Sequence, residues 1–358
     1  MAQATGPLDR IRSASGARRL PLPGFPGLDF RTALPPGLEW FEDDHESEEF
    51  AASGMFERLE RVWLGYEPAE RDRLEIAVWC ARIRPERAAL ASDYARLLAM
   101  VWGPLNFGID GAARDFGEVL AGESDTGFDR RLRISVWRRG LELLIIAAQT
   151  TLEDFEAKAP LMAALVGSLE FEAAVVPDPV IASLVAHHLP LSDGSRFAYL
   201  LPSHWPLWQE DANARLTARI HIDEADEGRS GAIGLFTTPV PANAPPDQAP
   251  LRQIATGTSE LMLMNLLPGT RIERKPMNES RMPGFAATPA QGMFGDALLR
   301  EDGVRLGATG FFIRAGHDVP GYSALSAWPE GQPGMGRMMH VNFVQRLVTD
   351  SLRDRFGG

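Results

Sequence analysis

Apolar and polar positions along the chain form two series of predicted elements in the same order. The first series starts at Phe30 with a short strand, "LDFRTAL", which a Pro-Pro-Gly turn ends. The second starts at Arg196 with "RFAYLLPSHW", again a strand that leads into a Leu-Pro turn. Each series continues with an aromatic and acidic segment, two strands, a helix, further strands and a closing helix. This repeated order, more than residue identity, indicates a duplicated domain.

In the first series, the sequence pattern predicts some elements clearly and leaves one open between a strand and a helix. Residues 73–83, "RLEIAVWCARI", are rich in Ile, Val and Trp and predict a strand, whereas residues 56–66 fit a strand or a helix. Residues 85–104 predict a helix, because proline favours the first helical position and Gly-Pro ends it. A hairpin around Gly140 follows, and then a closing helix in which Pro160 lies in the first turn or at a kink.

The second series repeats the pattern with a longer tail. "RLTARIHIDEA" and "AIGLFTTPV" predict two strands joined by a Gly-containing turn. Residues 251–269 predict a helix that ends at Pro-Gly, and several strand-like segments follow it. "HVNFVQRLVTDSLRDRF" closes the chain as an amphipathic helix that would bury Phe343, Leu347 and Leu352.

The domain organisation predicted from this pattern has four parts. A length of 358 residues favours two domains. Residues 1–26 hold several arginines and prolines with little apolar surface, which favours a flexible N-terminal arm; a basic arm that docks on an acidic partner is the alternative. Residues 27–174 form the first domain, the proline-rich residues 175–195 a linker, and residues 196–358 the second domain. The alternative arrangement is one helical N-terminal domain followed by one α+β domain.

Net charge, cysteine content and the length of apolar runs limit the classes of partner that the chain is expected to bind. The formal net charge of -12 argues against nucleic acid and anionic membranes as default partners. The single cysteine, Cys80, lies in an apolar run, where we expect a buried side chain that forms neither a disulfide nor a cysteine-based metal cage. No signal peptide is apparent, and apolar windows such as "LELLIIAA" are too short to span a bilayer. We therefore expect a soluble, cytoplasmic protein without stable membrane insertion.

The second half resembles a known fold family through the motif F-x-x-x-L-P-x-x-W. The motif occurs at Phe197, Leu201, Pro202 and Trp205, and the first half has Leu38 in place of the tryptophan. These residues and the order of elements resemble the PsbP/DcrB-like fold, which also includes the Ran-binding Mog proteins and the Eag-type chaperones of type VI secretion effectors. The resemblance implies an α+β chain of two tandem α/β/α sandwiches, each an antiparallel sheet flanked by helices. It also implies a binding protein, adaptor or chaperone without a catalytic site.

Motifs that carry chemistry are weak. The chain has no G-x-S-x-G elbow, no phosphate-binding loop and no dinucleotide fingerprint. His187 and His188 are adjacent, so regular structure would point them apart, away from a shared metal. His221 and Asp223 would share one face of a strand, where they could serve as a base and its orienting group or form a solvated surface. We expect no enzyme activity, no cofactor and no metal; a hydrolase that uses His221 is an alternative.

Aromatic and methionine side chains near acidic residues are the candidate partner contacts. Tryptophan is enriched at interface hot spots, and methionine lines adaptable binding grooves, although both residue types also fill cores. The predicted contacts are Trp40, Phe41, Trp205, Trp208, Met262 and Met264. The predicted function is a non-enzymatic protein-binding adaptor or chaperone, in its sharpest form one that serves the secretion of effectors. A small-ligand carrier is a further alternative, and the sequence leaves the oligomeric state open.

Overall fold

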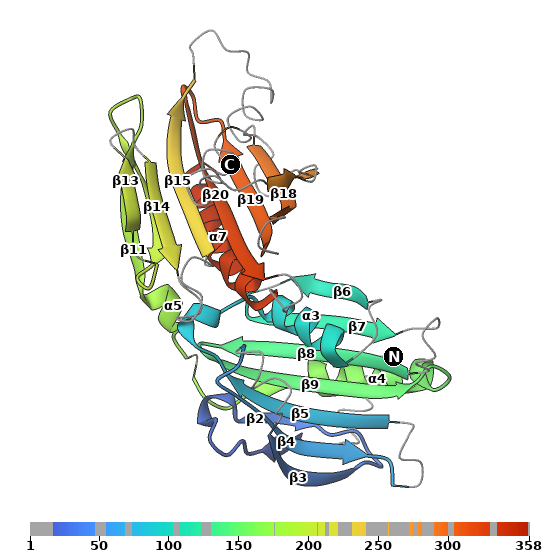
Figure 1. The fold of residues 1–358 in the computed structure, drawn as a ribbon. Coiled ribbons are helices and arrows are strands. Elements are labelled where there is room, and N and C mark those ends of the chain that lie inside the picture. The colour runs from blue at the N-terminus through green and yellow to red at the C-terminus, as the bar shows by residue number, and fades with distance from the viewer. Residues whose placement is uncertain are drawn as a thin grey trace, which may run out of the picture. The chain divides into compact units, whose positions relative to one another are not determined.

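The chain folds as two compact units, Met1–Pro179 (unit 1) and Val180–Gly358 (unit 2). The computed structural model describes residues 17–46, 55–68, 74–102, 107–112, 114–122, 130–174, 176–205, 207–211, 215–220, 231–240, 257, 272–274, 278–280, 290–299, 304–329 and 335–356. Within these residues the paired strands are antiparallel, and helices pack on the sheets (Figure 1). The fold class is therefore α+β, as predicted.

Unit 1 is built on a seven-stranded sheet with the order β3-β4-β5-β9-β8-β7-β6. The strands are β3 (Glu39–Glu46), β4 (Arg58–Tyr66), β5 (Leu74–Arg82), β6 (Phe107–Ala112), β7 (Phe116–Gly122), β8 (Arg130–Arg139) and β9 (Glu142–Thr151). Residues 58–66, for which the sequence fitted a strand or a helix, form a strand because β3 and β5 both pair with it. The central strands β5 and β9 are apolar on both faces, which indicates that both faces of the sheet are covered.

Two helices cover opposite faces of this sheet. α3 (Ala91–Trp102) packs on β6, β7 and β8, and its Trp102 ring lies 5.3 Å from the Trp79 ring of β5. α4 (Phe155–Gly167) packs on β9, β8 and β2 and joins the core formed by the other side of β5 (Figure 1). The predicted helix at 85–104 begins later than expected, because Pro85 opens a short 3-10 turn, Pro85–Arg87. Pro160 lies inside α4, beyond its first turn.

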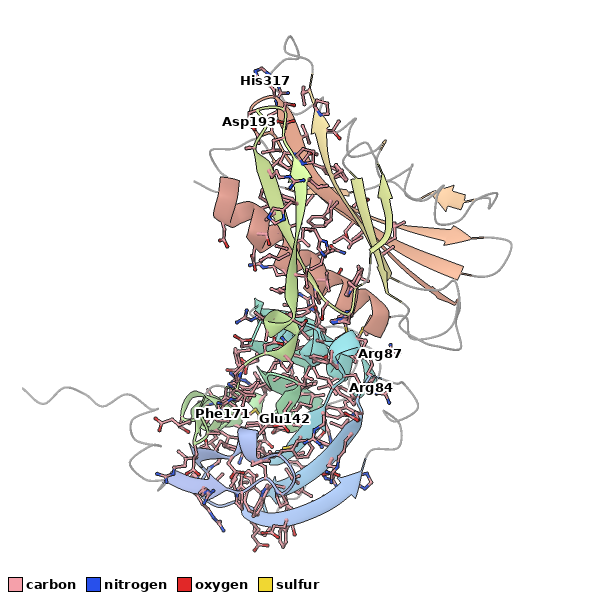
Figure 2. The ribbon with its side chains drawn as sticks, turned by 90° about the vertical axis from the view of Figure 1, so that its left-hand side faces the viewer. Arg84, Arg87, Glu142, Phe171, Asp193 and His317 are labelled. Carbon is pink, nitrogen blue, oxygen red and sulfur yellow. The ribbon has the colours of Figure 1, made fainter. Side chains whose placement is uncertain are left out.

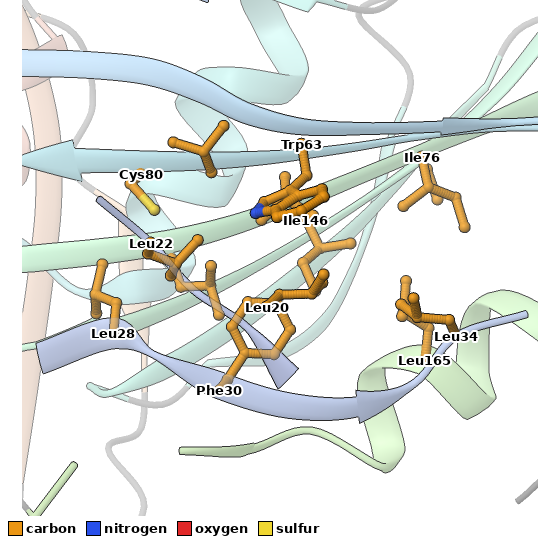
Figure 3. Packing of buried hydrophobic residues seen from close by; sticks show 14 of the residues in the cluster. Leu20, Leu22, Leu28, Phe30, Leu34, Trp63, Ile76, Cys80, Ile146 and Leu165 are labelled. Atoms are coloured by element: carbon orange, nitrogen blue, oxygen red, sulfur yellow. The ribbon is translucent and has the colours of Figure 1, made fainter. Parts of the chain in front are cut away.

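The core on the α4 side of the sheet includes a segment that the sequence assigned to a flexible arm. β1 (Ala17–Leu20) and β10 (Glu170–Phe171) pair with the two edges of β2 (Phe30–Ala33), and the 3-10 turn Pro26–Leu28 precedes β2. Figure 3 shows Leu20, Leu22, Leu28 and Phe30 packed against side chains from the large sheet and α4. The described part of the predicted arm, residues 17–26, is thus integral to the fold. The apolar residues spaced between its arginines and prolines bury themselves against distant strands.

Arginine side chains on the large sheet pack over aromatic rings of the segments that precede β2 and form β10. The guanidinium groups of Arg58 and Arg82 each lie 5.4 Å from the Phe25 ring centroid. Arg139 covers the Phe171 ring of β10, which Figure 2 labels, at 4.5 Å. Arg139 also donates a hydrogen bond to the Ala173 carbonyl. Partly buried cation–π contacts of this kind each contribute about 0.5–2 kcal/mol. They fix the chain on entry to and exit from unit 1.

A buried carboxylate on α3 predicts a pH-dependent stability. Burial raises the pKa of Asp93 from 3.8 to about 6, against the lowering effects of Arg96 and of a backbone hydrogen bond at Leu90. Because the folded pKa exceeds the unfolded one, this stability contribution is complete below about pH 4 and is lost as the pH rises through 6. At one pKa unit per 1.36 kcal/mol, the loss is at most about 3 kcal/mol.

We therefore expect Asp93→Asn to become progressively more stable than the wild type between pH 4 and pH 7. Asparagine keeps the hydrogen-bonding shape of the side chain and removes the buried charge. Amide hydrogen exchange of β7 and β8 in the full chain, measured for both proteins at several pH values, reports the difference. A difference in stability that stays constant over this range would contradict the prediction.

Unit 2 contains a sheet with the order β13-β14-β15-β20-β19-β18-β16, and β17 also pairs with β18. The strands are β13 (Leu207–Asp211), β14 (Arg215–Ile220), β15 (Gly231–Pro239), β16 (Ile272–Arg274), β17 (Asn278–Ser280), β18 (Ala290–Leu299), β19 (Val304–Ile313) and β20 (Asp318–Pro329). The closing helix α7 (Met335–Phe356) packs on β12, β15 and β20 and buries Phe343, Leu347 and Leu352, as its pattern predicts. Apart from Gly257, the predicted helix at 251–269 lies outside the described residues.

A hairpin opens unit 2 where the sequence predicted a linker. β11 (Leu184–Pro190) and β12 (Arg196–Pro202) pair along their full lengths, after the short helix α5 (Pro179–Ala182). The Asp-Gly-Ser signal thus marks a hairpin turn, with Gly194 at a positive φ of 82°. The backbone N–H and hydroxyl of Ser192 both donate to Asp318, so this turn meets the start of β20; Figure 2 labels the adjoining Asp193 and His317. The structure differs here from the linker predicted over 175–195.

A buried tyrosine joins the hairpin to the sheet of unit 2. The Tyr199 hydroxyl donates to the Phe236 carbonyl at 2.8 Å and accepts the Gly321 N–H at 3.0 Å. Tyr199→Phe would leave both backbone groups without this partner, and an unsatisfied buried group costs about 1–3 kcal/mol. We expect a loss of that size in the free energy of unfolding, measured by hydrogen exchange of β15 and β20.

Tyr322→Phe is the matched control for this substitution. The Tyr322 hydroxyl meets the Thr349 hydroxyl at 2.9 Å, and Thr349 already donates to the Gln345 carbonyl. Removing the Tyr322 hydroxyl takes no partner from a backbone N–H. We therefore expect a smaller loss in the free energy of unfolding, below about 1 kcal/mol. Equal losses for the two variants would show that the Tyr199 hydrogen bonds to β15 and β20 contribute no more to stability than the Tyr322–Thr349 contact.

Candidate protein-binding surface

Trp205, predicted as a partner contact, belongs to the core of unit 2. Its side chain is 2% exposed, and its indole N–H donates to Nε2 of His340 on α7 at 3.0 Å. The His204 ring lies beside the same His340 nitrogen at 3.3 Å. Trp205 therefore anchors the turn after β12 to the closing helix, which is the role that the alternative interpretation of these aromatics gave it.

Trp40 also faces inward. The ring lies directly over Gly65 of β4, where an added Cβ would come within 2.8 Å of it. Trp40 is half-buried and packs at the margin of the core shown in Figure 3. Glycine at position 65 provides the space for this ring, so the two residues act as a packing pair.

Phe41 points to the other side of the sheet, because side chains alternate along a strand. It is 44% exposed, one of a few large apolar side chains with such exposure in the described chain. Its ring stacks on Tyr66 of β4 with 5.2 Å between centroids and 9° between planes. The sequence singled out Phe41 but missed Tyr66, because the pairing of β3 with β4 places them together.

The remaining predicted contacts are not placed by the structure. The backbone of Trp208 lies in β13, and nothing follows about its side chain. Met262 and Met264 lie outside the described residues, as do His221 and Asp223 of the hydrolase alternative. The roles of these five residues stay predictions.

The surroundings of Phe41 follow from the strand register. Directly paired residues share a face of an antiparallel sheet, so Leu64 and Ala77 continue the row that begins at Phe41. The neighbouring row is Glu39, Tyr66 and Glu75. We call the side chains of these six residues the Phe41–Tyr66 surface. It is an aromatic and aliphatic centre with one carboxylate on either side of Tyr66.

Beyond the row of Phe41, Leu64 and Ala77, the Phe41–Tyr66 surface borders a polar pair, Asp43 and Arg61, and then α3. Asp43 accepts a hydrogen bond from Arg61 at 2.6 Å, and the Arg61 guanidinium lies 5.5 Å from the Trp79 ring. Trp79 in turn contacts Trp102 at the end of α3. The apolar surface is therefore bounded by an internally paired arginine on the side toward α3.

The outer edge of β3 is a poor site for strand addition. A register shift interrupts its pairing with β4 between Glu42 and His45, and the strand carries acidic residues along its length. Bulges and charges are devices by which edge strands avoid pairing with other chains. Addition of a partner strand at β3 is therefore disfavoured.

Other candidate chemistry lacks a suitable geometry. Cys80 is buried, and burial raises the pKa of its thiol well above the ordinary value, which makes it unreactive. His187 and His188 pair with successive residues of β12, Tyr199 and Ala198, and so point to opposite faces. No cluster of three or more metal-ligating side chains occurs among the described residues. Nor does that part of the chain contain a helix of the length and apolarity needed to cross a membrane.

Comparison by sequence gives no relative. The chain matches no protein family model, and no curated protein matches it.

Comparison by structure finds similar chains at low identity. Cyanobacterial PsbP from Synechocystis sp. PCC 6803 is 12% identical, with 44% of this chain and 93% of that chain covered and a TM-score of 0.30. The Ran-binding protein Mog1p of Saccharomyces cerevisiae is 11% identical, with 48% and 94% covered and a TM-score of 0.29. The type VI secretion immunity protein TplEi of Pseudomonas aeruginosa is 10% identical, with 95% and 97% covered and a TM-score of 0.21.

Proposed function

We propose that the chain is a non-enzymatic protein-binding adaptor or chaperone that contacts its partner through the Phe41–Tyr66 surface. The observation that supports this most directly is the exposure of the Phe41 ring, which stacks on Tyr66 near the β3 edge of the seven-stranded sheet. Stacked aromatics present a large, rigid apolar area, which is typical of interface hot spots. Burying it in a complex would gain the hydrophobic free energy that the isolated chain leaves unused.

We further propose that the two units arose by tandem duplication. Their sheet orders coincide when β3, β4 and β5 are matched with β13, β14 and β15, and β9, β8 and β7 with β20, β19 and β18. A helix follows the matched strands β9 and β20, and a short pair of strands precedes β3 and β13. In this proposal the second unit keeps Trp205 as a core anchor, and the first unit carries the binding surface.

The sharpest form of the proposal is a chaperone or adaptor for effectors of a secretion system. This form rests on the resemblance of the motif at Phe197, Leu201, Pro202 and Trp205 to the PsbP/DcrB-like family. Genes next to that of this chain should then encode a secretion apparatus or an effector, and the effector should bind the purified chain.

The test of the proposal compares two exposed apolar residues. Phe41→Ser and Val185→Ser each remove a side chain of similar exposure, 44% and 45%, from units 1 and 2 respectively. Val185→Ser should change the free energy of unfolding by no more than about 0.5 kcal/mol. Phe41→Ser also loses the stacked pair with Tyr66, so we expect it to cost about 0.5–1.5 kcal/mol, which leaves the chain folded. Proteins that co-purify with the tagged chain from its own cells should be lost with Phe41→Ser and kept with Val185→Ser. Equal retention by both variants would reject the surface as the binding site.

A further inference from the structure

The two carboxylates beside Tyr66 give the Phe41–Tyr66 surface a definite charge. Glu39 lies directly across from Tyr66 on one side and Glu75 directly across on the other. Glu39 is exposed and Glu75 is half-buried. Within the described part of the chain, neither carboxylate takes part in an ion pair. Both carboxylates lie next to Tyr66, where a cation that approaches the aromatic pair would meet them.

The nearest arginine on this face of β4 does not neutralise them. Arg61 is held by Asp43 and covers Trp79, so its charge is directed to the flank of the surface. Other acidic side chains of unit 1 have partners of their own, such as Glu118 with Arg133 and Glu142 with Arg82. Glu39 and Glu75 have no such arginine partner among the described residues, and they are the two carboxylates that lie beside the exposed aromatic pair.

We infer that the occupant of the Phe41–Tyr66 surface is a protein segment in which lysine or arginine adjoins an apolar or aromatic residue. This inference rests on the proposed function and names the chemistry of the partner. The apolar residue would cover Phe41 and Leu64, and the cation would lie between Glu39 and Glu75 above the Tyr66 ring. A cation beside carboxylates and over an aromatic face gains both ion-pair and cation–π attraction.

The charge also favours this partner over others. An acidic segment would place like charges against Glu39 and Glu75, which disfavours complexes. A wholly apolar segment would remove both carboxylates from water without a partner, and this desolvation is costly. Only a segment that is both cationic and apolar satisfies the centre and the flanks of the surface together.

The experiment selects phage-displayed random linear peptides on the full chain. Wild-type protein should enrich peptides with Lys or Arg beside an apolar residue, and Phe41→Ser should abolish their binding. Glu39→Gln with Glu75→Gln should weaken binding several-fold, up to about 25-fold, if each ion pair contributes at most about 1 kcal/mol. Glu39→Lys with Glu75→Lys should instead select peptides rich in Asp and Glu.

Glu42→Gln is the matched control. Glu42 is exposed on the same strand, but it pairs with Trp63 and so belongs to the other face. It should leave the affinity of the selected peptides unchanged, and an equal loss with Glu42→Gln would overturn the inference. Selected peptides that need Phe41 for binding but show no enrichment of Lys or Arg would also overturn the inference. That result would still support the proposed protein-binding function. Selected peptides whose binding is insensitive to Phe41→Ser would contradict both.

Discussion

Gly117→Ala is expected to destabilise unit 1 by more than about 3 kcal/mol, above the usual range for an overpacked core. Gly117 lies on β7 directly beneath the start of α3. A Cβ added there would lie 2.2 Å from the Ser92 Cα and 2.3 Å from the Ser92 backbone nitrogen. Both atoms belong to the helix backbone, so no rotation of a side chain relieves the clash, and α3 must move off the sheet. Denaturant unfolding of the full chain, with hydrogen exchange of β7 and β8, measures the loss.

Gly167→Ala is the matched control for this substitution. Gly167 ends α4, and a Cβ added there meets nothing within 4 Å. Alanine in a helix is favoured over glycine by about 0.5–1 kcal/mol, so this variant should be neutral or slightly stabilised. Similar stabilities of Gly117→Ala and Gly167→Ala would show that α3 does not pack on β7 at this distance.

Asp178→Ala is expected to cost unit 1 about 3–5 kcal/mol, the typical result of removing one partner of a buried ion pair. The Arg138 side chain on β8 is fully buried, and its Nη2 lies 2.8 Å from Asp178 Oδ2, whose side chain is 12% exposed. Without Asp178 the guanidinium would keep its charge in the interior, since arginine does not deprotonate in proteins. Urea unfolding of the variant and the wild type gives the difference.

A double-mutant cycle separates the ion pair from the loss of packing. Replacing both residues, Arg138→Leu with Asp178→Ala, removes the stranded charge, so the double variant should recover part of the stability that Asp178→Ala loses. Asp43→Ala provides a control, because it breaks the ion pair with Arg61, whose side chain is 26% exposed. That variant should lose about 1 kcal/mol or less. A double variant no more stable than Asp178→Ala would contradict the buried-charge explanation.

The sequence pattern predicted the strands within the two units better than the segments at the start of each unit. Residues 73–83 and the hairpin around Gly140 were predicted as strands from their apolar, β-branched and aromatic residues, and the structure buries these residues on both faces of the sheet. Residues 17–26 of the predicted arm and residues 184–190 of the predicted linker form structure for a common reason. Their prolines and arginines indicate exposed loops. The apolar residues of 17–26 instead pack against strands far away in sequence, and residues 184–190 pair with the next strand, β12.

The candidate site could be predicted only in part. Alternation along β3 places Trp40 and Phe41 on opposite faces, but the sequence does not reveal which face α4 and β1 cover. That depends on tertiary packing, which buries Trp40 against Gly65 and leaves Phe41 exposed. Tyr66, Glu39 and Glu75 meet only through the register of β3, β4 and β5, which no local signal specifies. Trp205 was selected by its residue type; the alternative that it fills the core was open from the sequence, but its contact with His340 of α7 was not.

Photo-crosslinking from position 41 tests the central claim most directly. A photoreactive phenylalanine analogue replaces Phe41 in one variant and Val185 in another, and each chain is expressed in its own cells and irradiated. We predict a defined protein adduct from position 41 that disappears when Tyr66 is changed to serine and that position 185 does not form. The absence of an adduct at position 41, or the same adducts from both positions, would contradict a partner-binding role for the Phe41–Tyr66 surface.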